Sequence, residues 1–108
     1  IMKGAIASVE LFVHREGEHT DPRRLTLTLS APERVRDKGE ATPDWVCRIV
    51  LADLHPPESV KAADSLSALA GALGQGRSWL DALRDEGLRI TRDRNGKVDF
   101  SWSDFGPS

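Results

Sequence analysis

The chain has 108 residues, of which 39% are hydrophobic and 30% charged. This length and composition are typical of a single soluble globular domain, and they exclude a disordered chain. The 15 Lys and Arg residues against 17 Asp and Glu residues give a net charge of −2. Without a basic excess to neutralise a phosphate backbone, dedicated nucleic-acid binding is disfavoured. We treat residues 2–108 as one domain, because we interpret Met2 as the initiator and Ile1 as a remnant before it.

Cysteine content and hydropathy predict where the protein works. Cys47 is the only cysteine, so an intramolecular disulfide and a cysteine-based zinc finger are excluded. No run of about 18 apolar residues could span a membrane, and the first residues lack the pattern of a signal peptide. We therefore expect a soluble cytoplasmic protein with no membrane partner.

Two alternating segments predict a β-hairpin near the start of the chain. In residues 5–13 the apolar side chains fall on odd positions, and in residues 24–30 Leu25, Leu27 and Leu29 alternate with polar residues. Turn-forming residues at 16–22 separate the two segments. The hairpin should bury one face and leave the other, polar face towards solvent.

The middle of the chain predicts a loop and a third strand. Residues 33–43 are polar and carry charges of both signs, which is typical of a mobile loop. Residues 44–54 alternate again, with Trp45, Cys47 and Ile49 on the more apolar face. His55-Pro56-Pro57 should close this strand, because prolines cannot donate to a β-ladder. Residues 59–63 fit either a short edge strand or the first turn of a helix.

A long helix follows, with Asp64 or Ser65 as its N-cap. Leucines at helical spacing predict its buried stripe: Leu66, Leu69, Leu73, Leu80 and Leu83. Gly87 is well placed to end the helix in the left-handed conformation. Three internal glycines each cost roughly 1 kcal/mol relative to alanine, so a break near Gly74 is the main alternative.

The last segment predicts a second hairpin with two possible registers. A two-residue Asn95-Gly96 turn would pair Ile90 with Ser101, whereas a three-residue loop would pair Ile90 with Phe100. We favour the second register, because it places the large apolar side chains on one face and uses Gly96 in a left-handed conformation. The fold expected is α+β: an antiparallel sheet of five or six strands with one long helix packed on one face.

Several groups of residues suggest chemistry, and each has a simpler structural interpretation. An acid, a base and a hydroxyl lie close together in the sequence at Asp53, His55, Asp64 and Ser65. A helix cap explains Asp64 and Ser65, and no nucleophile-presenting turn surrounds the serine. The three histidines lack metal-site spacing. Cys47 belongs to an apolar strand face, where burial makes a thiol inert. We therefore assign no catalytic, cofactor-binding or metal-ligating residue.

One helix face suggests association. Residues 65–76 contain no charge, and a second face of the helix carries small or neutral residues: Ala68, Gly71, Ala72 and Gln75. Such a face is either covered within the chain or meets a partner, of which a second copy in a homodimer is the simplest. We take these four residues as the candidate interface.

Three short patterns carry a resemblance to known proteins. They are Trp45-x-Cys47, the run Asp64-Ser65-Leu66-Ser67-Ala68-Leu69 and the closing Trp102-x-Asp104-Phe105-Gly106-Pro107. Together they resemble a family of short bacterial proteins of unknown function, with strands followed by one helix. The resemblance spans residues 5–107 and implies a bacterial stand-alone domain of accessory or immunity type, without implying an activity.

Two functions follow from these observations. The first is a non-enzymatic module that binds a protein partner or itself, since the chain has no catalytic motif and its acidic balance suits a basic partner. The alternative is a small-ligand-binding or enzyme domain with a pocket between sheet and helix, lined by Trp79 and Trp102. We prefer the first, because a chain this small leaves little volume for a pocket.

Overall fold

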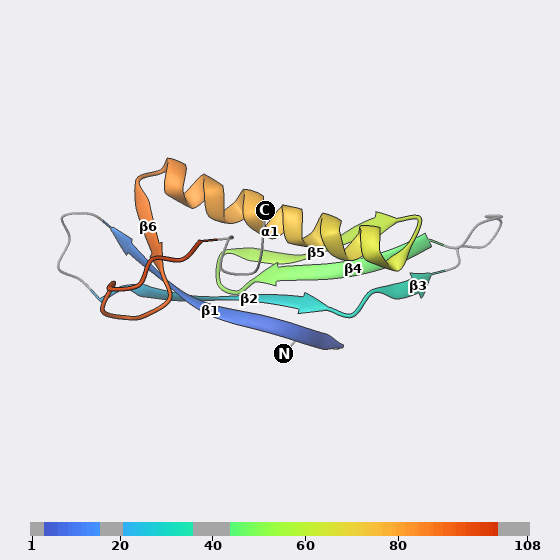
Figure 1. Cartoon of the computed structure of the whole chain (residues 1–108), viewed down its shortest axis with the longest axis horizontal. Coiled ribbons are helices and arrows are strands. Elements are labelled where there is room, and N and C mark those ends of the chain that lie inside the picture. The colour runs from blue at the N-terminus through green and yellow to red at the C-terminus, as the bar shows by residue number, and fades with distance from the viewer. Residues whose placement is uncertain (1–3, 16–20, 36–43, 102–108) are drawn as a thin grey trace.

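A computed structural model of the chain describes residues 4–15, 21–35 and 44–101. These residues form one helix on an antiparallel sheet of six strands, so the α+β fold expected from the sequence is confirmed (Figure 1). The elements, in chain order, are β1 (Ala5–Arg15), β2 (Arg23–Ser30), β3 (Glu33–Val35), β4 (Asp44–Leu51), β5 (His55–Ala62), α1 (Ser65–Asp85) and β6 (Leu88–Thr91).

The sheet follows the order β3-β4-β2-β1-β6, with β5 also paired to β4. β2 pairs with residues 49–51 of β4 and β3 with residues 44–46, while β5 pairs along both stretches. β2 and β3 must therefore lie end to end along one edge of β4, opposite β5. Between them the Ser30 hydroxyl accepts the Arg48 N–H at 2.8 Å, so a side chain continues the ladder just before Pro32.

Two predictions about strand boundaries need correction. Residues 33–35 belong to β3 rather than to a loop, because they pair with the start of β4; residues 36–43 of that predicted loop lie outside the described residues. The third strand ends at Leu51 instead of residue 54, and Asp53 turns the chain with a φ of +70°. His55-Pro56-Pro57 then begins β5, an edge strand where prolines are tolerated. Residues 59–63 are mostly strand, the first of the two alternatives.

The helix begins at the predicted place. Asp64 is its N-cap: one carboxylate oxygen accepts the Ser67 N–H at 2.6 Å and the other accepts the Ser67 hydroxyl at 2.9 Å. α1 continues through Gly74 without a break. It ends just before Gly87, whose φ of +88° places it in the left-handed region.

The buried stripe of α1 differs from the predicted leucine stripe. Its buried residues are Ala68, Ala72, Gly76, Trp79 and Leu80. Leu66 and Leu73 are instead 73% and 42% exposed. The reason is the close approach of helix and sheet: a Cβ at Gly76 would lie only 2.8 Å from Cδ1 of Ile49. Ala68, Ala72 and Gly76 face the sheet together with Trp79 and Leu80, whereas Leu69 and Leu83 are only partly buried against the core.

The four residues of the candidate interface on α1 differ in exposure. Ala68 and Ala72 are fully buried, and Gln75 is half-buried. A Cβ at Gly71 would lie 2.7 Å from Cγ1 of Val60 in β5. Ala68 and Ala72 are therefore covered within the chain, largely by β4 and β5, whereas Gly71 and Gln75 stay partly exposed.

The C-terminal hairpin has the favoured register. Thr91 pairs with Asp99, and the Phe100 N–H donates to the Ile90 carbonyl at 3.0 Å. Gly96 has a φ of +72°, as the three-residue loop requires. The large side chains of Ile90 and Phe100 are both buried in the core on the helix side of the sheet.

Candidate functional site

The residues that suggested catalysis serve separate structural roles. The Asp64 carboxylate caps α1, and the His55 ring stacks on Trp79 with 4.6 Å between ring centroids. The Asp53 backbone carbonyl accepts a hydrogen bond from Nη2 of Arg23 at 2.7 Å. This arrangement explains each residue without a nucleophile and its base.

Cys47 is fully buried in the core, as predicted. Burial raises the pKa of its thiol, although a hydrogen bond with Ser30 acts in the opposite direction. A thiol in this environment is a packing element rather than a nucleophile. Within the described part of the chain, no three His, Cys, Asp or Glu side chains gather into a group that could hold a metal ion.

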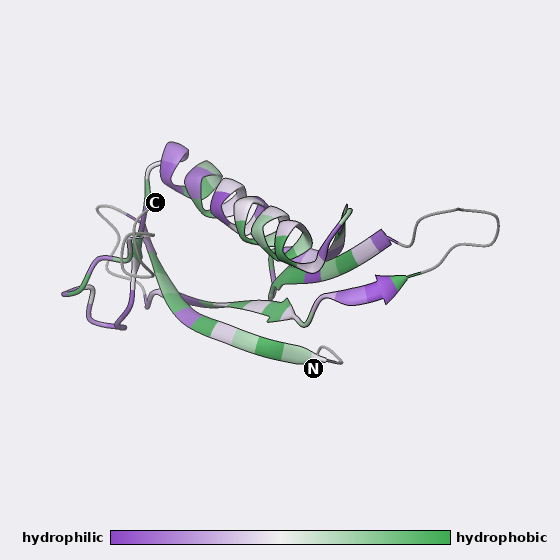
Figure 2. Ribbon diagram, turned by 45° about the vertical axis from the view of Figure 1, so that its right-hand side comes forward, coloured by the Kyte–Doolittle hydropathy of each residue, from purple (hydrophilic) through white to green (hydrophobic). Residues whose placement is uncertain are grey.

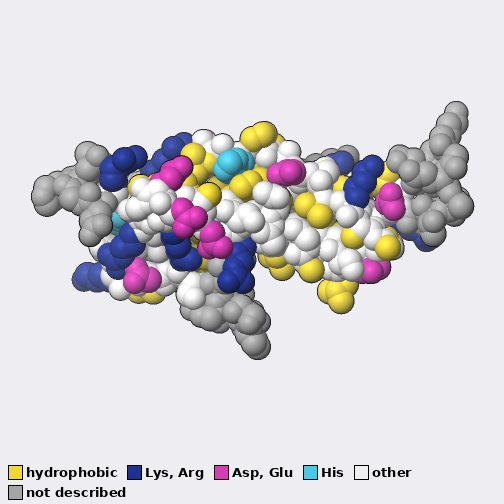
Figure 3. Space-filling model, turned by 90° about the horizontal axis from the view of Figure 1, so that it is seen from above, with side chains coloured by type: hydrophobic (Ala, Val, Ile, Leu, Met, Phe, Trp, Pro, Cys, Tyr) yellow, Lys and Arg dark blue, Asp and Glu magenta, His cyan; other side chains and the backbone are white. Residues whose placement is uncertain are grey.

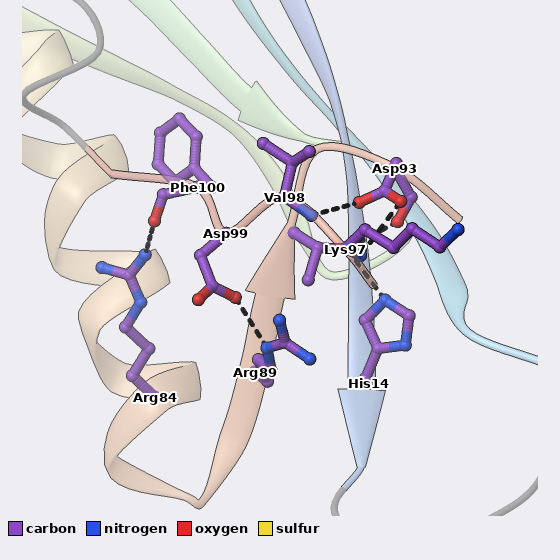
Figure 4. Close-up of polar contacts among 9 residues, drawn as sticks. His14, Arg84, Arg89, Asp93, Lys97, Val98, Asp99 and Phe100 are labelled. Atoms are coloured by element: carbon purple, nitrogen blue, oxygen red, sulfur yellow. Dashed lines mark hydrogen bonds and ion pairs between the residues drawn. The ribbon is translucent and has the colours of Figure 1, made fainter. Parts of the chain in front are cut away.

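A polar network centred on the buried Thr91 hydroxyl fixes the loop after β6, part of which Figure 4 shows. The Thr91 hydroxyl donates to the Asp93 carbonyl at 2.7 Å, so it accepts its 2.8 Å hydrogen bond from Nε2–H of His14. The Asp93 carboxylate accepts the N–H groups of Lys97 and Val98, which lowers its pKa. Because Thr91 is completely buried, this network orders the loop and presents no reactive hydroxyl to solvent.

The outer edge of β1 is open over most of its length. β6 pairs only with Phe12–Arg15, so no described strand flanks residues 5–11 on that side. The Thr26 carbonyl accepts the Ala52 N–H at 2.9 Å, so the backbone of Thr26 faces away from β1. Backbone groups alternate along an antiparallel ladder, and Glu10 lies opposite Thr26. The N–H and C=O groups of Glu10 and Ser8 therefore point out of the sheet edge.

The two long edges of the sheet differ in chemistry. β5 carries Pro56, Pro57 and Lys61 along its edge, residue types that discourage pairing with another strand. The open part of β1 has no proline, and Glu10 is its one charged residue. An unprotected strand edge of this kind is a template for adding a further strand.

An apolar groove lies beside this edge, on the helix side of the sheet. We call it the β1 groove; its volume is about 180 Å³, and it is lined by Ala7, Ser8, Val9, Leu27, Leu29, Ile49 and Leu73. The groove exists because α1 packs chiefly on β4 and β5. The helix therefore leaves the hydrophobic first half of β1 uncovered (Figure 2). Seen from the helix side, charged side chains crowd the end where α1 finishes, and hydrophobic side chains are scattered over the middle of the molecule (Figure 3).

None of the four α1 residues assigned to an interface from the sequence lines the β1 groove. The signal that could have indicated the β1 groove is the absence of charge from Ala5 to Val9, together with the outward Ile6, which is 56% exposed. Leu66 and Leu73, assigned to the core by their spacing, also contribute exposed apolar surface on α1.

A second concavity lies at the opposite end, beneath the last turn of α1. This helix-end cavity measures about 330 Å³ and is lined by Val13, His14, Arg15, Asp21, Pro22, Arg23, Leu25, Leu54, Leu83, Glu86 and Leu88. A pocket between sheet and helix therefore exists, but Trp79 does not line it, and Trp102 lies outside the described residues.

Comparison with known proteins adds no functional assignment. In the described residues, the helix is not long and apolar enough to cross a lipid bilayer. No protein-family model, curated protein or solved structure matches the chain.

Proposed function

We propose that this protein is a non-enzymatic protein-binding module that adds an extended segment of its partner to the open edge of β1. The observation that carries the proposal is the outward-facing backbone of Ser8 and Glu10 on an edge without proline. In strand addition, main-chain hydrogen bonds supply affinity, and pockets for alternate side chains supply specificity.

The β1 groove defines the chemistry of the partner. Alternate side chains of an added strand face the helix side of the sheet, where Ala7, Val9 and Leu73 form apolar walls. The partner segment should therefore carry apolar residues at every second position. The other positions face the side that holds the Glu10–Arg24 ion pair, where polar residues fit.

The resemblance to short bacterial proteins agrees with this function. A bacterial cytoplasmic accessory module, including one of immunity type, acts by binding a protein and needs no catalytic residue. Ser8 and Glu10 could also pair with the same edge of a second copy, so homodimerisation is one form of the proposed activity.

The experiment is selection of random peptides from a display library on the immobilised protein, followed by calorimetric titration of a selected peptide. The test variant is Ser8→Pro, which removes the outward N–H and is tolerable at a strand edge. Ser8→Ala is the matched control, because it loses the same hydroxyl but keeps the N–H. Thermal unfolding of both variants checks that the fold is retained.

The proposal expects selected peptides with alternating apolar residues, bound by the unmodified protein and by Ser8→Ala but much more weakly by Ser8→Pro. Equal binding to both variants would show that the peptide does not use the β1 edge. Sedimentation equilibrium of the unmodified protein tests whether a second copy is itself a partner. A dimer that is lost in Ser8→Pro would show that two copies associate through the β1 edge.

A further inference from the structure

The helix-end cavity is separate from the β1 groove, and a ligand bound there would be a further activity beyond the proposed strand addition. The lining of this cavity is mixed: charged and polar residues stand beside apolar side chains from three parts of the fold, Val13 and Leu25 of the sheet, Leu54 of the β4–β5 turn, and Leu83 and Leu88 around the end of α1. Its volume of about 330 Å³ lies at the lower end of the roughly 300–1,000 Å³ typical of small-molecule sites.

Charged residues of both signs line this cavity. Arg15 at the end of β1 and Arg23 at the start of β2 line the sheet side. Glu86 lines it as the C-cap of α1, where the helix dipole adds partial negative charge. Asp21 supplies a further carboxylate at the cavity.

A hydrogen bond to the backbone fixes the position of the Arg23 side chain. One of its N–H groups donates to the Asp53 carbonyl at 2.7 Å, which orients the guanidinium beside the cavity. A guanidinium has five N–H donors in a planar fork, so this bond leaves donors for a carboxylate ligand.

We infer that this cavity binds a zwitterionic apolar amino acid. The ligand carboxylate would bind Arg23, its ammonium group would lie towards Glu86, and its apolar side chain would contact Leu25, Leu54 and Leu83. A ligand with only one of these charges engages only one of Arg23 and Glu86, and a ligand without an apolar side chain makes no contact with the leucines. The chemistry therefore selects against simple anions, cations and glycine.

The test is a titration of the full chain with L-phenylalanine up to millimolar concentration. Binding is followed by the changes in backbone amide NMR shifts. 3-Phenylpropionate lacks the ammonium group, phenethylamine lacks the carboxylate and glycine lacks the ring. We expect saturable shifts around Leu25, Leu54 and Leu83 with L-phenylalanine, and at least about tenfold weaker binding of each analogue.

Two neighbouring arginines give a matched pair of variants. Arg23→Gln should weaken L-phenylalanine binding at least about tenfold, whereas Arg24→Gln should leave it unchanged, because Arg24 lies on the opposite face of β2 and pairs with Glu10. Glu86→Gln should weaken L-phenylalanine but not 3-phenylpropionate, and it serves if Arg23→Gln fails to fold.

Three results would overturn the inference: no saturable shift at the cavity, equal binding of L-phenylalanine and both single-charge analogues, or equal loss in Arg23→Gln and Arg24→Gln. Each of these leaves the proposal for the β1 edge intact, since Ser8 lies outside this cavity.

Discussion

Adding one methyl group at Gly76 tests how closely α1 approaches the sheet. In an open helix the change from glycine to alanine stabilises by about 1 kcal/mol. At Gly76, however, the new Cβ would lie 2.8 Å from Cδ1 of Ile49 and 3.3 Å from Cδ2 of Leu27. Both side chains are buried in the core, so they cannot move into solvent. Overpacking of this kind costs about 1–3 kcal/mol, and Gly76→Ala should therefore lower the unfolding free energy by up to about 2 kcal/mol.

Gly74→Ala is the control, because a Cβ there meets nothing within 4 Å. It should raise the unfolding free energy by about 0.5–1 kcal/mol through helix propensity alone. Urea denaturation, analysed as a two-state transition, measures both variants. If Gly76→Ala stabilises the protein as much as Gly74→Ala does, α1 does not approach β4 as closely as described.

Three further predictions concern the core, the polar network and acid stability. Leu80→Ala should cost about 2–5 kcal/mol of unfolding free energy because Leu80 is fully buried. Leu73→Ala should cost clearly less, because the Leu73 side chain flanks the β1 groove. Equal losses of unfolding free energy in urea denaturation would contradict the assignment of the buried stripe. Thr91→Val should cost about 1–3 kcal/mol of unfolding free energy, because the His14 N–H loses its acceptor and the Asp93 carbonyl keeps only the Gly96 N–H. Thr91→Ser should retain most of the stability, and indistinguishable thermal midpoints for the two variants would contradict the network. Hydrogen bonds lower the pKa of Asp64 and Asp93 in the folded state, so the stability they contribute is present above the unfolded pKa of about 4 and is lost as the pH falls towards the folded values. Asp93→Asn should reduce this loss in acid titrations of stability, and an unchanged acid profile would show that Asp93 does not contribute to it.

The C-terminal hairpin shows what local sequence reasoning can predict. Its two candidate registers differ by one residue, and only one of them places Ile90 and Phe100 on the same face. Because burial of large apolar residues outweighs turn preference, the register followed from the sequence and is confirmed by the Thr91–Asp99 pair. The N-cap at Asp64 and the strand in β2 were predictable for the same local reasons.

The buried face of α1 could not be predicted in this way. Hydrophobic spacing identifies apolar residues, but it does not give the distance between the helix and the sheet. Here Ala72 and Gly76 allow a close approach, and the close approach excludes Leu73 from the interface. The open edge of β1 depends on strand order: β6 returns from far along the sequence and pairs with only the last part of β1. Neither feature has a local signal.

The central claim, that the β1 edge receives a partner strand, is tested most directly by amide hydrogen exchange at alternating residues of β1. In the free protein at low concentration, the N–H groups of Ser8 and Glu10 should exchange fast, whereas those of Val9 and Leu11, which face β2, should be protected. Addition of a library-selected peptide should slow Ser8 and Glu10 and leave Val9 and Leu11 unchanged. Fast exchange at Ser8 and Glu10 with the peptide bound would contradict the proposed mode of binding.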